Sequence, residues 1–537
     1  MSDAMQNTEC QYYRKRLKRW AGSNPTGSIL LVCFISLLIG WGLSQLHPPV
    51  PSVHDEFAYL LSGDTFAEGR LTNPPHPMWQ HFETMHVIHQ PTYASKYPPG
   101  QGVMLALGQV VMDQPIVGVW VMSALGVLAS YWMLLGFVPA RWAVVGASLL
   151  VMLPGYQIYW GQSYWGGTLA CIGGALLLGS IPRLQKSLHI KNAIVFAGGA
   201  LILAVTRPFE GVVLFLLAGG WLVVGWIRLG WPAWRPLVLR FLLPMFGILG
   251  AGTWALATYN TAVTGSPFVM PYQVHDQSYG MCPLFLWQAP QEDRQYRHPA
   301  MDKFHREWEM PFYRDQQSLS QILQAKWIML QVLGKILLPI VAAIPLLGIL
   351  WWRGRNLRGP LIVLCLFWLL TQVTIWNLPH YLAPGLALIL LVVVYGLRNL
   401  NVSTHQWQWP ISPVALLLVG QMLLFVGEAW KYATMPLDDW QYVRQNRQIE
   451  LSEMAGKQLV FVDYETGHDP LQEWVYNQAD IDASKVVWAR SMSEEEDLEL
   501  REFFSDRKAW RLSADADSPN LRPWNYPQVK LDITASR

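Results

Sequence analysis

Long apolar segments separated by short polar turns make up most of the first 430 residues. A helix of roughly 20 apolar residues crosses the hydrocarbon core of a bilayer, and most of these segments approach that length. The pattern therefore predicts a mainly α-helical integral membrane protein. We expect about eleven membrane-spanning helices, at 28–46, 115–137, 142–158, 165–181, 192–206, 209–227, 237–258, 327–351, 360–376, 381–397 and 411–428.

One apolar piece, from Gly102 to Met112, is too short to span the membrane and follows a break at Pro98 and Pro99. We expect it to form a re-entrant or interfacial helix. If it does not span and the N-terminus is cytoplasmic, every short cytoplasmic turn is basic, as the positive-inside rule requires. A spanning piece would move every later turn to the other side. The basic residues of these turns are Arg141, Arg183, Lys186, Lys191, Arg228, Arg235, Arg240, Arg353, Arg355, Arg358 and Arg398.

The chain becomes polar and charged after Phe425. Three short β-type runs, at 459–462, 486–489 and 509–512, predict strands. Between the last two runs, Ser493 is placed as the N-cap of a helix whose first turn is acidic. The predicted organisation is a basic cytoplasmic N-terminus, a transmembrane catalytic domain with a large first outer loop, and a small periplasmic or extracellular α/β domain. Their bounds are 1–27, 28–430 (outer loop 47–114) and 431–537.

The composition supports a membrane protein and excludes several other classes. Only 14% of residues are charged, whereas soluble chains average about 25%. The net charge of +2 gives no case for a nucleic-acid partner. The five cysteines include no CxxC pair, so we expect no disulfide framework and no thiolate metal site. The basic residues ahead of the first apolar segment predict an uncleaved signal-anchor.

Candidate chemistry gathers in the polar stretch 53–102, directly after the first predicted span. Ionisable groups beside a membrane span usually have a function. Asp55 and Glu56 begin an amphipathic helix that Gly69 can end. A capping box between Ser52 and Asp55 is the structural alternative. Both interpretations can hold, because a helix N-terminus also fixes a carboxylate in place.

Lys96 is the only lysine of the first outer loop, and Tyr97 and two prolines follow it. Its ammonium group suits a phosphate, although a lysine can also extend from the membrane interface towards water. Between residues 76 and 89, the loop also holds Glu83 and four histidines. They do not form a zinc motif, so separate hydrogen-bonding roles are favoured and a divalent cation is left open. These histidines are His76, His81, His86 and His89.

The other predicted outer turns add further candidates. Tyr164 and Trp165 suit packing against a sugar or an isoprenoid, or form an interfacial aromatic belt. Arg207 and Glu210 lie at the outer end of a span, where they serve a ligand or pair with each other. His380 lies in a similar polar turn. The long outer loop 259–326 contains segments that could contact an acceptor, with a solvated loop as the default; they are 271–276 and 294–306.

These features together resemble the GT-C membrane glycosyltransferases. They resemble in particular the bacterial (family 39-like) relatives of protein O-mannosyltransferases and of the lipid A aminoarabinose transferase. The resemblance covers about residues 28–400, and its most specific parts are His54-Asp55-Glu56 and Lys96-Tyr97-Pro98-Pro99. It implies transfer of a sugar from a polyprenyl-phosphate carrier to a lipid, glycan or protein acceptor. The reaction would take place on the outer face of a bacterial inner membrane.

The resemblance also implies roles for individual residues. Asp55 would be the catalytic acid residue of the first loop, and Lys96 would face the donor phosphate. Arg207 is assigned to the donor phosphate as well, because of its location and not because of a motif. Many relatives have a second acid in the second outer loop, where this chain has Ser163-Tyr-Trp-Gly-Gly. That departure weakens the case for a metal-bridged mechanism. If the reaction uses a second acidic residue, that residue would be Glu56. The expected substrate-contacting residues are His54, Tyr97, Tyr164, Trp165, Glu210 and His380.

Two other functions remain as alternatives. A transporter or flippase of lipid-linked glycans would place ionisable groups at mid-membrane, whereas here they lie in outer loops. A ligase or polymerase would use a polyprenyl diphosphate donor. The C-terminal domain either recognises the acceptor, through 467–477, or is a structural appendage.

Overall fold

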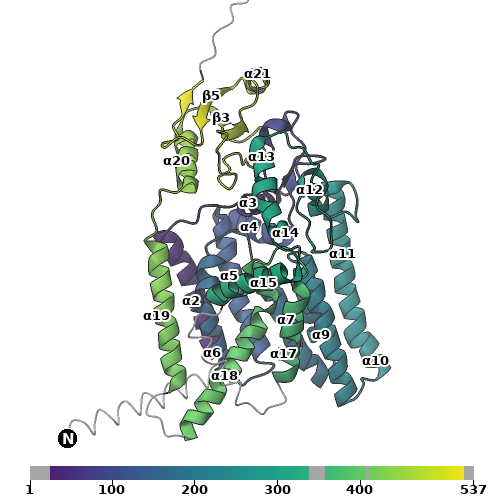
Figure 1. Ribbon diagram of the computed structural model, residues 1–537. Helices are drawn as coiled ribbons and strands as arrows, with labels where there is room; N and C mark the ends of the chain where they lie inside the picture. Colours follow the sequence, from purple (N-terminus) through teal and green to yellow (C-terminus); the bar gives the residue numbers. More distant parts are fainter. Residues whose placement is uncertain (1–24, 338–356, 407–411, 525–537) are drawn as a thin grey trace, which may run out of the picture.

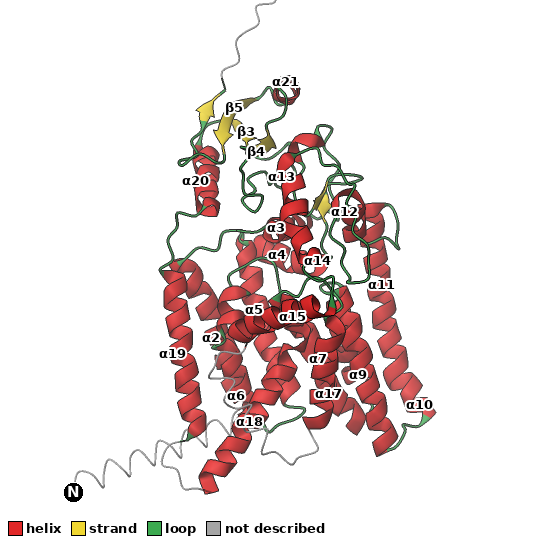
Figure 2. Cartoon of the chain, viewed as in Figure 1, coloured by secondary structure: helices red, strands yellow, loops and turns green. Residues whose placement is uncertain are grey.

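The computed structural model describes residues 25–337, 357–406 and 412–524 of the chain. Long helices form an upright bundle, and the four-stranded sheet of the C-terminal part lies beyond one end of it (Figure 1). Short helices and loops fill the layer between the bundle and the sheet (Figure 2). Most of the predicted cytoplasmic N-terminus 1–27 lies outside the described residues.

Ten apolar helical segments build the bundle in the described part of the chain. Seven are long and apolar enough to cross a membrane. Five of these are single helices: α2 (Pro25–Leu46), α5 (Pro115–Leu134), α7 (Thr168–Lys186), α9 (Pro208–Leu229) and α19 (Pro413–Ala433). The other two are composite: Trp234–Thr264 contains α10 (Trp234–Leu237), η3 (Val238–Leu242) and α11 (Leu243–Thr264), and Pro379–Asn401 contains η6 (Pro379–Gly385) and most of α18 (Leu386–Gln406). Three are shorter: α6 (Ala140–Val151), α8 (Ile190–Ala204) and α17 (Arg358–Thr371).

These segments coincide with ten of the predicted spans. The remaining one, 327–351, overlaps α15 (Leu319–Leu337), which runs crosswise to the upright helices (Figure 1). The rest of that predicted span lies outside the described residues. A multi-pass membrane protein is therefore confirmed, while the count of eleven spans is not.

The outward faces of the bundle carry large apolar side chains. Leu216 is 65% exposed and Trp254 is 74% exposed. Soluble monomers rarely expose contiguous apolar surface on this scale. Lipid chains can cover these faces without any loss of hydrogen bonds, because helices satisfy their own backbone groups.

The short apolar piece of the first outer loop forms α4 (Pro99–Met112), which packs along α3 (His54–Ala67). A helix of this length extends about 21 Å, which is less than the roughly 30 Å hydrocarbon core. Glycines allow the close approach. A Cβ on Gly102 would lie 2.5 Å from the Cβ of Ser62, and one on Gly63 would lie 2.9 Å from the Cβ of Leu105.

The outer loops complete the layer above the bundle. The first contains η1 (Trp79–Phe82) and a two-stranded antiparallel ribbon of β1 (Val87–Ile88) and β2 (Ala94–Ser95). Between α6 and α7, the chain forms the short helix η2 (Gly155–Tyr159) and the second outer loop. The long outer loop contains α12 (Pro271–Tyr279), α13 (Pro299–Lys303), η4 (Phe304–Glu309) and α14 (Met310–Arg314).

The C-terminal part has the predicted α/β character. Its strands follow the order β4-β3-β5-β6, with β3, β4 and β5 parallel and β6 antiparallel to β5. As predicted, Ser493 caps the helix, because its Oγ accepts from the Glu496 amide (3.3 Å). The elements are α20 (Trp440–Glu453), β3 (Lys457–Asp463), β4 (Val486–Arg490), α21 (Glu494–Phe503), β5 (Arg507–Ser513) and β6 (Arg522–Pro523).

This C-terminal part shares one apolar core with the first outer loop. Phe461 of β3 and Tyr476 are buried in the same cluster as Phe57 of α3 and Phe82 of η1. Burial of apolar surface is the main favourable contribution to such an association. The α/β part is therefore docked on the first outer loop through a joint core.

We predict that Gly102→Ala destabilises the protein, because the new methyl group would meet the Cβ of Ser62 at the contact between α3 and α4. Overpacking of this kind costs about 1–3 kcal/mol and should lower the thermal midpoint in detergent. Gly198→Ala is the matched control, since a Cβ there has no atom within 4 Å. An equal midpoint for both variants would contradict the close packing of α3 on α4.

Candidate functional site

The first turn of α3 places Asp55 at the centre of the polar groups of the outer layer. Its Oδ1 accepts a hydrogen bond from the Tyr97 hydroxyl (2.7 Å). The same oxygen lies 3.1 Å from Nε2 of His86. Among the described residues, Oδ2 has no hydrogen-bond partner, and the side chain is 24% exposed. One carboxylate oxygen is therefore held by the protein, and the other is free to meet a substrate.

The ribbon of β1 and β2 brings Lys96 next to this carboxylate. His86 and Lys96 face each other at the end of the ribbon, where the Lys96 amide donates to the His86 carbonyl (3.1 Å). The Lys96 ammonium lies 5.3 Å from the centre of the Tyr97 ring. It forms no ion pair within the described part of the chain. The two residues with the most specific motif resemblance, Asp55 and Lys96, are thus brought together by the fold.

The electrostatics of the cluster keep its charges in place. Burial alone would raise the pKa of Asp55, but His86, Lys96 and Tyr97 outweigh it and hold the pKa below the usual range. Burial lowers the pKa of Lys96, and Glu309, Asp55 and Asp276 oppose that shift. Burial and the nearby Lys96 lower the pKa of His86. At neutral pH the site therefore holds an ionised Asp55 beside a neutral His86.

Glu56 points away from Asp55, since consecutive positions of a helix do not face one another. Its Oε2 accepts from the Ser52 amide (2.8 Å) and hydroxyl (3.2 Å), and its Oε1 accepts from the Tyr164 amide (2.9 Å). The capping contact of Ser52 is thus made with Glu56, whereas the sequence suggested Asp55. Burial raises the pKa of Glu56 to about 7. Its contacts join the start of α3 to the second outer loop.

A small, partly open pocket lies next to the Asp55 cluster. Arg207, at the start of α9, contributes to its wall, and the guanidinium lies 4.7 Å from the centre of the Tyr381 ring. No ion pair between Arg207 and Glu210 is present within the described residues. The residues that line the pocket are Tyr59, Pro98, Gln101, Trp165, Gly166, Gly167, Leu169, Ala170, Thr206 and Arg207.

Two stacked rings connect the pocket to Asp55. Tyr97, which donates to Asp55, stacks on Tyr59 of the pocket wall with ring centres 4.4 Å apart. The Gly100 amide donates to the Val205 carbonyl (2.8 Å), which fixes the Lys96 turn against the segment that carries Arg207. Asp55, Lys96 and Arg207 therefore belong to one continuous site.

The pocket also presents unsatisfied polar atoms. Nε1 of Trp165 and Oε1 of Gln101 are buried and have no hydrogen-bond partner within the described residues. Such atoms normally find partners, so they mark positions where a ligand can bind. Gly166 and Gly167 have φ of 86° and 127°, which suit glycine and bring the loop against Gln101 and Trp160.

The remaining predicted residues lie around this pocket. The ring of His380 lies 6.1 Å from that of Trp165. Tyr164 is buried, and its hydroxyl donates to the Pro49 carbonyl (3.2 Å). Glu210 is buried in the first turn of α9. His54 faces the C-terminal part, with Nδ1 2.7 Å from the Tyr476 hydroxyl.

The long outer loop contributes residues that the sequence did not single out as catalytic. The His275 ring of α12 lies 5.9 Å from that of His86. Glu309 of η4 is held by His305, whose Nδ1 lies 2.5 Å from Oε2. The segment 271–276 was noted as a possible acceptor contact, but Glu309 lies beyond both segments considered. No local pattern marks it, because only the folded loop brings it towards Lys96.

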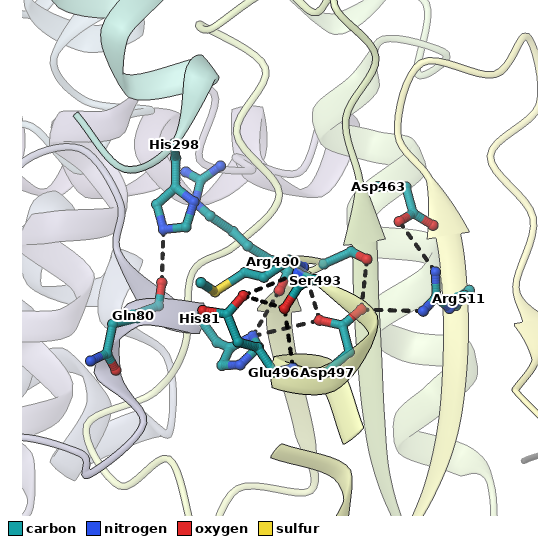
Figure 3. A network of polar contacts seen from close by, with 11 residues as sticks. Gln80, His81, His298, Asp463, Arg490, Ser493, Glu496, Asp497 and Arg511 are labelled. Atoms are coloured by element: carbon teal, nitrogen blue, oxygen red, sulfur yellow. Dashed lines mark hydrogen bonds and ion pairs between the residues drawn. The ribbon is translucent and has the colours of Figure 1, made fainter. Parts of the chain in front are cut away.

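The histidines of the first loop have separate partners. Nε2 of His76 lies 3.0 Å from Oδ1 of Asp482. Nδ1 of His81 lies 3.0 Å from the carbonyl oxygen of Arg490 (Figure 3). His86 meets Asp55, and the ring of His89 lies 5.5 Å from that of Tyr93. Individual polar contacts, as favoured from the sequence, describe this arrangement. Within the described ranges, no group of three or more His, Cys, Asp or Glu side chains is placed to hold a metal ion.

Comparison with known proteins adds information about the fold. No family model matches this sequence, and no curated protein matches it significantly. The chain is similar to the crystal structure of ArnT from Cupriavidus metallidurans bound to undecaprenyl phosphate, with 12% identity, a TM-score of 0.53, and coverage of 91% of this chain and 93% of that chain. Apo ArnT gives 12% identity and a TM-score of 0.51 with the same coverage. The GT-C-like fold expected from the sequence is therefore confirmed.

A test of the site concerns Glu56. Because burial raises its pKa to about 7 in the folded state, its contribution to stability is complete below about pH 4 and is lost as the pH rises to about 7. The shift corresponds to roughly 3 kcal/mol. We expect Glu56→Gln to remove this dependence, so the difference in thermal midpoint between variant and wild type should change between about pH 4 and pH 7 and stay constant above that range. A constant difference would show that Glu56 is ionised throughout.

Proposed function

We propose that this protein is a membrane glycosyltransferase that moves a sugar from a polyprenyl-phosphate carrier to an envelope acceptor. The observation that carries the proposal is the combination of the free Oδ2 of Asp55 with the cations Lys96 and Arg207 in one site. This site lies at the end of the bundle that faces the C-terminal sheet (Figure 1). A lipid-linked donor would present its phosphate at that level. The shared fold with ArnT, whose crystal structure contains undecaprenyl phosphate, supports a donor of this kind.

The proposed reaction is a single displacement at the anomeric carbon. The acceptor oxygen forms a bond to that carbon while the bond to the donor phosphate oxygen breaks. The acceptor proton passes to Asp55, and polyprenyl phosphate leaves with the bonding electrons. Because one displacement inverts the carbon, the enzyme is inverting. No strong general acid is required, since a phosphate is already a good leaving group.

Lys96 and Arg207 hold the charge that develops on the leaving phosphate. Before the donor binds, Lys96 helps to hold the pKa of Asp55 below its usual range, which makes Asp55 a weak base. A bound phosphate would partly neutralise Lys96 and let the Asp55 pKa rise. Donor binding would therefore strengthen the base at the moment when the acceptor needs it.

The residues around the pocket position the substrates. Trp165 packs against the sugar or the isoprenoid, and Tyr59 and Gln101 line the same pocket. Tyr97 orients Asp55, and His380 supports Trp165. Glu56 and Tyr164 hold the second outer loop on α3, while Glu210 fixes the start of α9 and His54 faces the C-terminal part. Glu56 therefore acts by position, and proton transfer is assigned to Asp55.

The proposed location is a bacterial inner membrane. The basic turns place the N-terminus 1–27 in the cytoplasm under the positive-inside rule. The catalytic domain 28–430 then opens to the periplasm, and the domain 431–537 lies in that compartment. The acceptor is a lipid, a glycan or a protein of the envelope.

We predict that Asp55→Asn lowers kcat for transfer by at least about 10²-fold, the usual contribution of a general base, and leaves donor binding intact. The measurement is mass spectrometry of envelope lipids and glycans in a deletion strain complemented with each variant. Asp113→Asn is the matched control, because Asp113 is exposed on the same loop and its left-handed backbone suits asparagine.

The outcomes separate the competing functions. A glycan that disappears on deletion and returns with wild type and Asp113→Asn, but not with Asp55→Asn, supports transfer, and its mass names the sugar. Restoration by Asp55→Asn would remove Asp55 from the mechanism and favour a transporter. Activity of the purified protein only with polyprenyl diphosphate donors would instead indicate a ligase or polymerase.

A second prediction concerns Lys96. Burial lowers the pKa of its ammonium group. Because donor binding requires the charged form, kcat/KM should fall with rising pH before the ordinary lysine range near about 10.4 is reached. Lys96→Arg should keep activity and move this alkaline limb to higher pH. Lys431→Arg, at an exposed position outside the site, should leave the limb in place. An unmoved limb in Lys96→Arg would separate Lys96 from donor binding.

A further inference from the structure

We propose that the C-terminal α/β part positions the Asp55–His86 pair through Tyr476 and Arg490, and is therefore part of the catalytic machinery. This inference rests on the proposed function, because it assigns a task within that same site. Tyr476 and Arg490 are positioning residues, since neither touches the reacting groups themselves.

Tyr476 contacts both of the segments that carry the pair, one with Asp55 and the other with His86. Its hydroxyl lies 2.7 Å from Nδ1 of His54, the residue before Asp55. The same hydroxyl donates to the carbonyl of Met85, the residue before His86 (3.4 Å). Its ring stacks on Phe57, with ring centres 4.1 Å apart and planes 2° from parallel. One side chain of the C-terminal part thus joins the start of α3 to the turn that carries His86.

Arg490 holds the same turn a few residues earlier. Its Nε donates to the Glu83 carbonyl (2.6 Å), and its own carbonyl lies 3.0 Å from Nδ1 of His81 (Figure 3). Its guanidinium pairs with Glu473, and the two side chains are 2% and 0% exposed. A buried ion pair of this kind is strongly destabilised when one partner is removed. The backbone at 81–83 is therefore tied to a rigid point of the C-terminal part.

The carboxylate of Glu83 meets the long outer loop on its other side. It accepts from the Tyr279 hydroxyl (3.0 Å) and lies near Nε of Arg297 (3.2 Å) and Nε2 of His298 (3.3 Å). Three segments that are distant in the sequence therefore meet at Glu83. The turn 83–86 has little freedom as long as these contacts are present.

This restraint matters because His86 has an unusual backbone. Its φ is 66°, which is uncommon for a residue other than glycine and persists only where surrounding contacts determine it. Its Nδ1 is buried without a partner in the described part of the chain, so no second hydrogen bond of its own fixes the ring. The orientation of Nε2 towards Asp55 then depends on the turn. A displacement of about 1 Å in a catalytic group can lower a rate about 10²-fold.

The alternative is that the C-terminal part is only docked on the first loop. The contact between His76 and Asp482 (3.0 Å) provides a control for docking, because it joins the same two parts but does not touch the turn 83–86. If docking alone mattered, loss of this contact would have the same effect as loss of the Tyr476 hydroxyl. If position matters, only the second change would reach Asp55.

The test compares Tyr476→Phe, which keeps the stacked ring and removes the hydroxyl, with Asp482→Ala, which removes the acceptor of the His76 contact, in the full-length protein. For Tyr476→Phe we expect kcat about 10- to 100-fold lower, with little change in the donor KM. The acid limb of kcat/KM should move to higher pH, because weaker contact with His86 lets the pKa of Asp55 rise. Asp482→Ala should leave kcat and the acid limb unchanged. Arg490→Lys, which keeps a cation beside Glu473, should act in the same direction as Tyr476→Phe.

Hydrogen–deuterium exchange of the same variants in detergent gives a readout independent of catalysis. Peptides that cover 83–96 should exchange faster in Tyr476→Phe and at the wild-type rate in Asp482→Ala. Unchanged exchange and kcat in Tyr476→Phe would overturn the inference, as would equal losses in both variants. If exchange changes as expected but neither wild type nor Asp55→Asn shows any transfer from a polyprenyl-phosphate donor, the proposed function fails and the positioning of the turn stands.

Discussion

A partly buried carboxylate remains charged only when nearby groups compensate for the water that it has lost, and the outer layer of this protein is arranged around that requirement at Asp55. The Tyr97 hydroxyl and the His86 ring meet one of its oxygens. Lys96 is brought near by the ribbon of β1 and β2. Because the compensation comes from a single side of the carboxylate, the second oxygen remains available for chemistry.

The position of this site at one end of the bundle follows from the shape of the first outer loop. α4 is too short to cross the membrane, and glycines let it pack closely along α3. The chain therefore returns to the surface with its polar residues on the same side as Asp55. Arg207 reaches this level from the start of α9, which extends the site into a pocket beneath Tyr59.

The docked α/β part changes how the chain is divided. Its sheet shares a core with α3 and η1, and Tyr476 contacts His54 and Met85, the residues that precede Asp55 and His86. A boundary near 430, which the change in composition suggests, marks the end of the apolar helices. The C-terminal part has an apolar cluster of its own, which includes Val460 and Trp474, and it shares a second cluster with the first outer loop.

The sequence by itself determined the features that depend on local patterns. Runs of apolar residues predict the membrane helices, Pro98 and Pro99 predict the break before α4, and Ser493 predicts a helix start, because each depends on neighbours within a few residues. Asp55 and Lys96 could be chosen in the same way, since charged groups are rare beside membrane spans. The tertiary structure decided which groups meet. Three contacts join segments that are far apart in the chain: Asp55 with His86, Glu56 with Tyr164, and Glu309 near Lys96. A local sequence pattern contains no information about such distances.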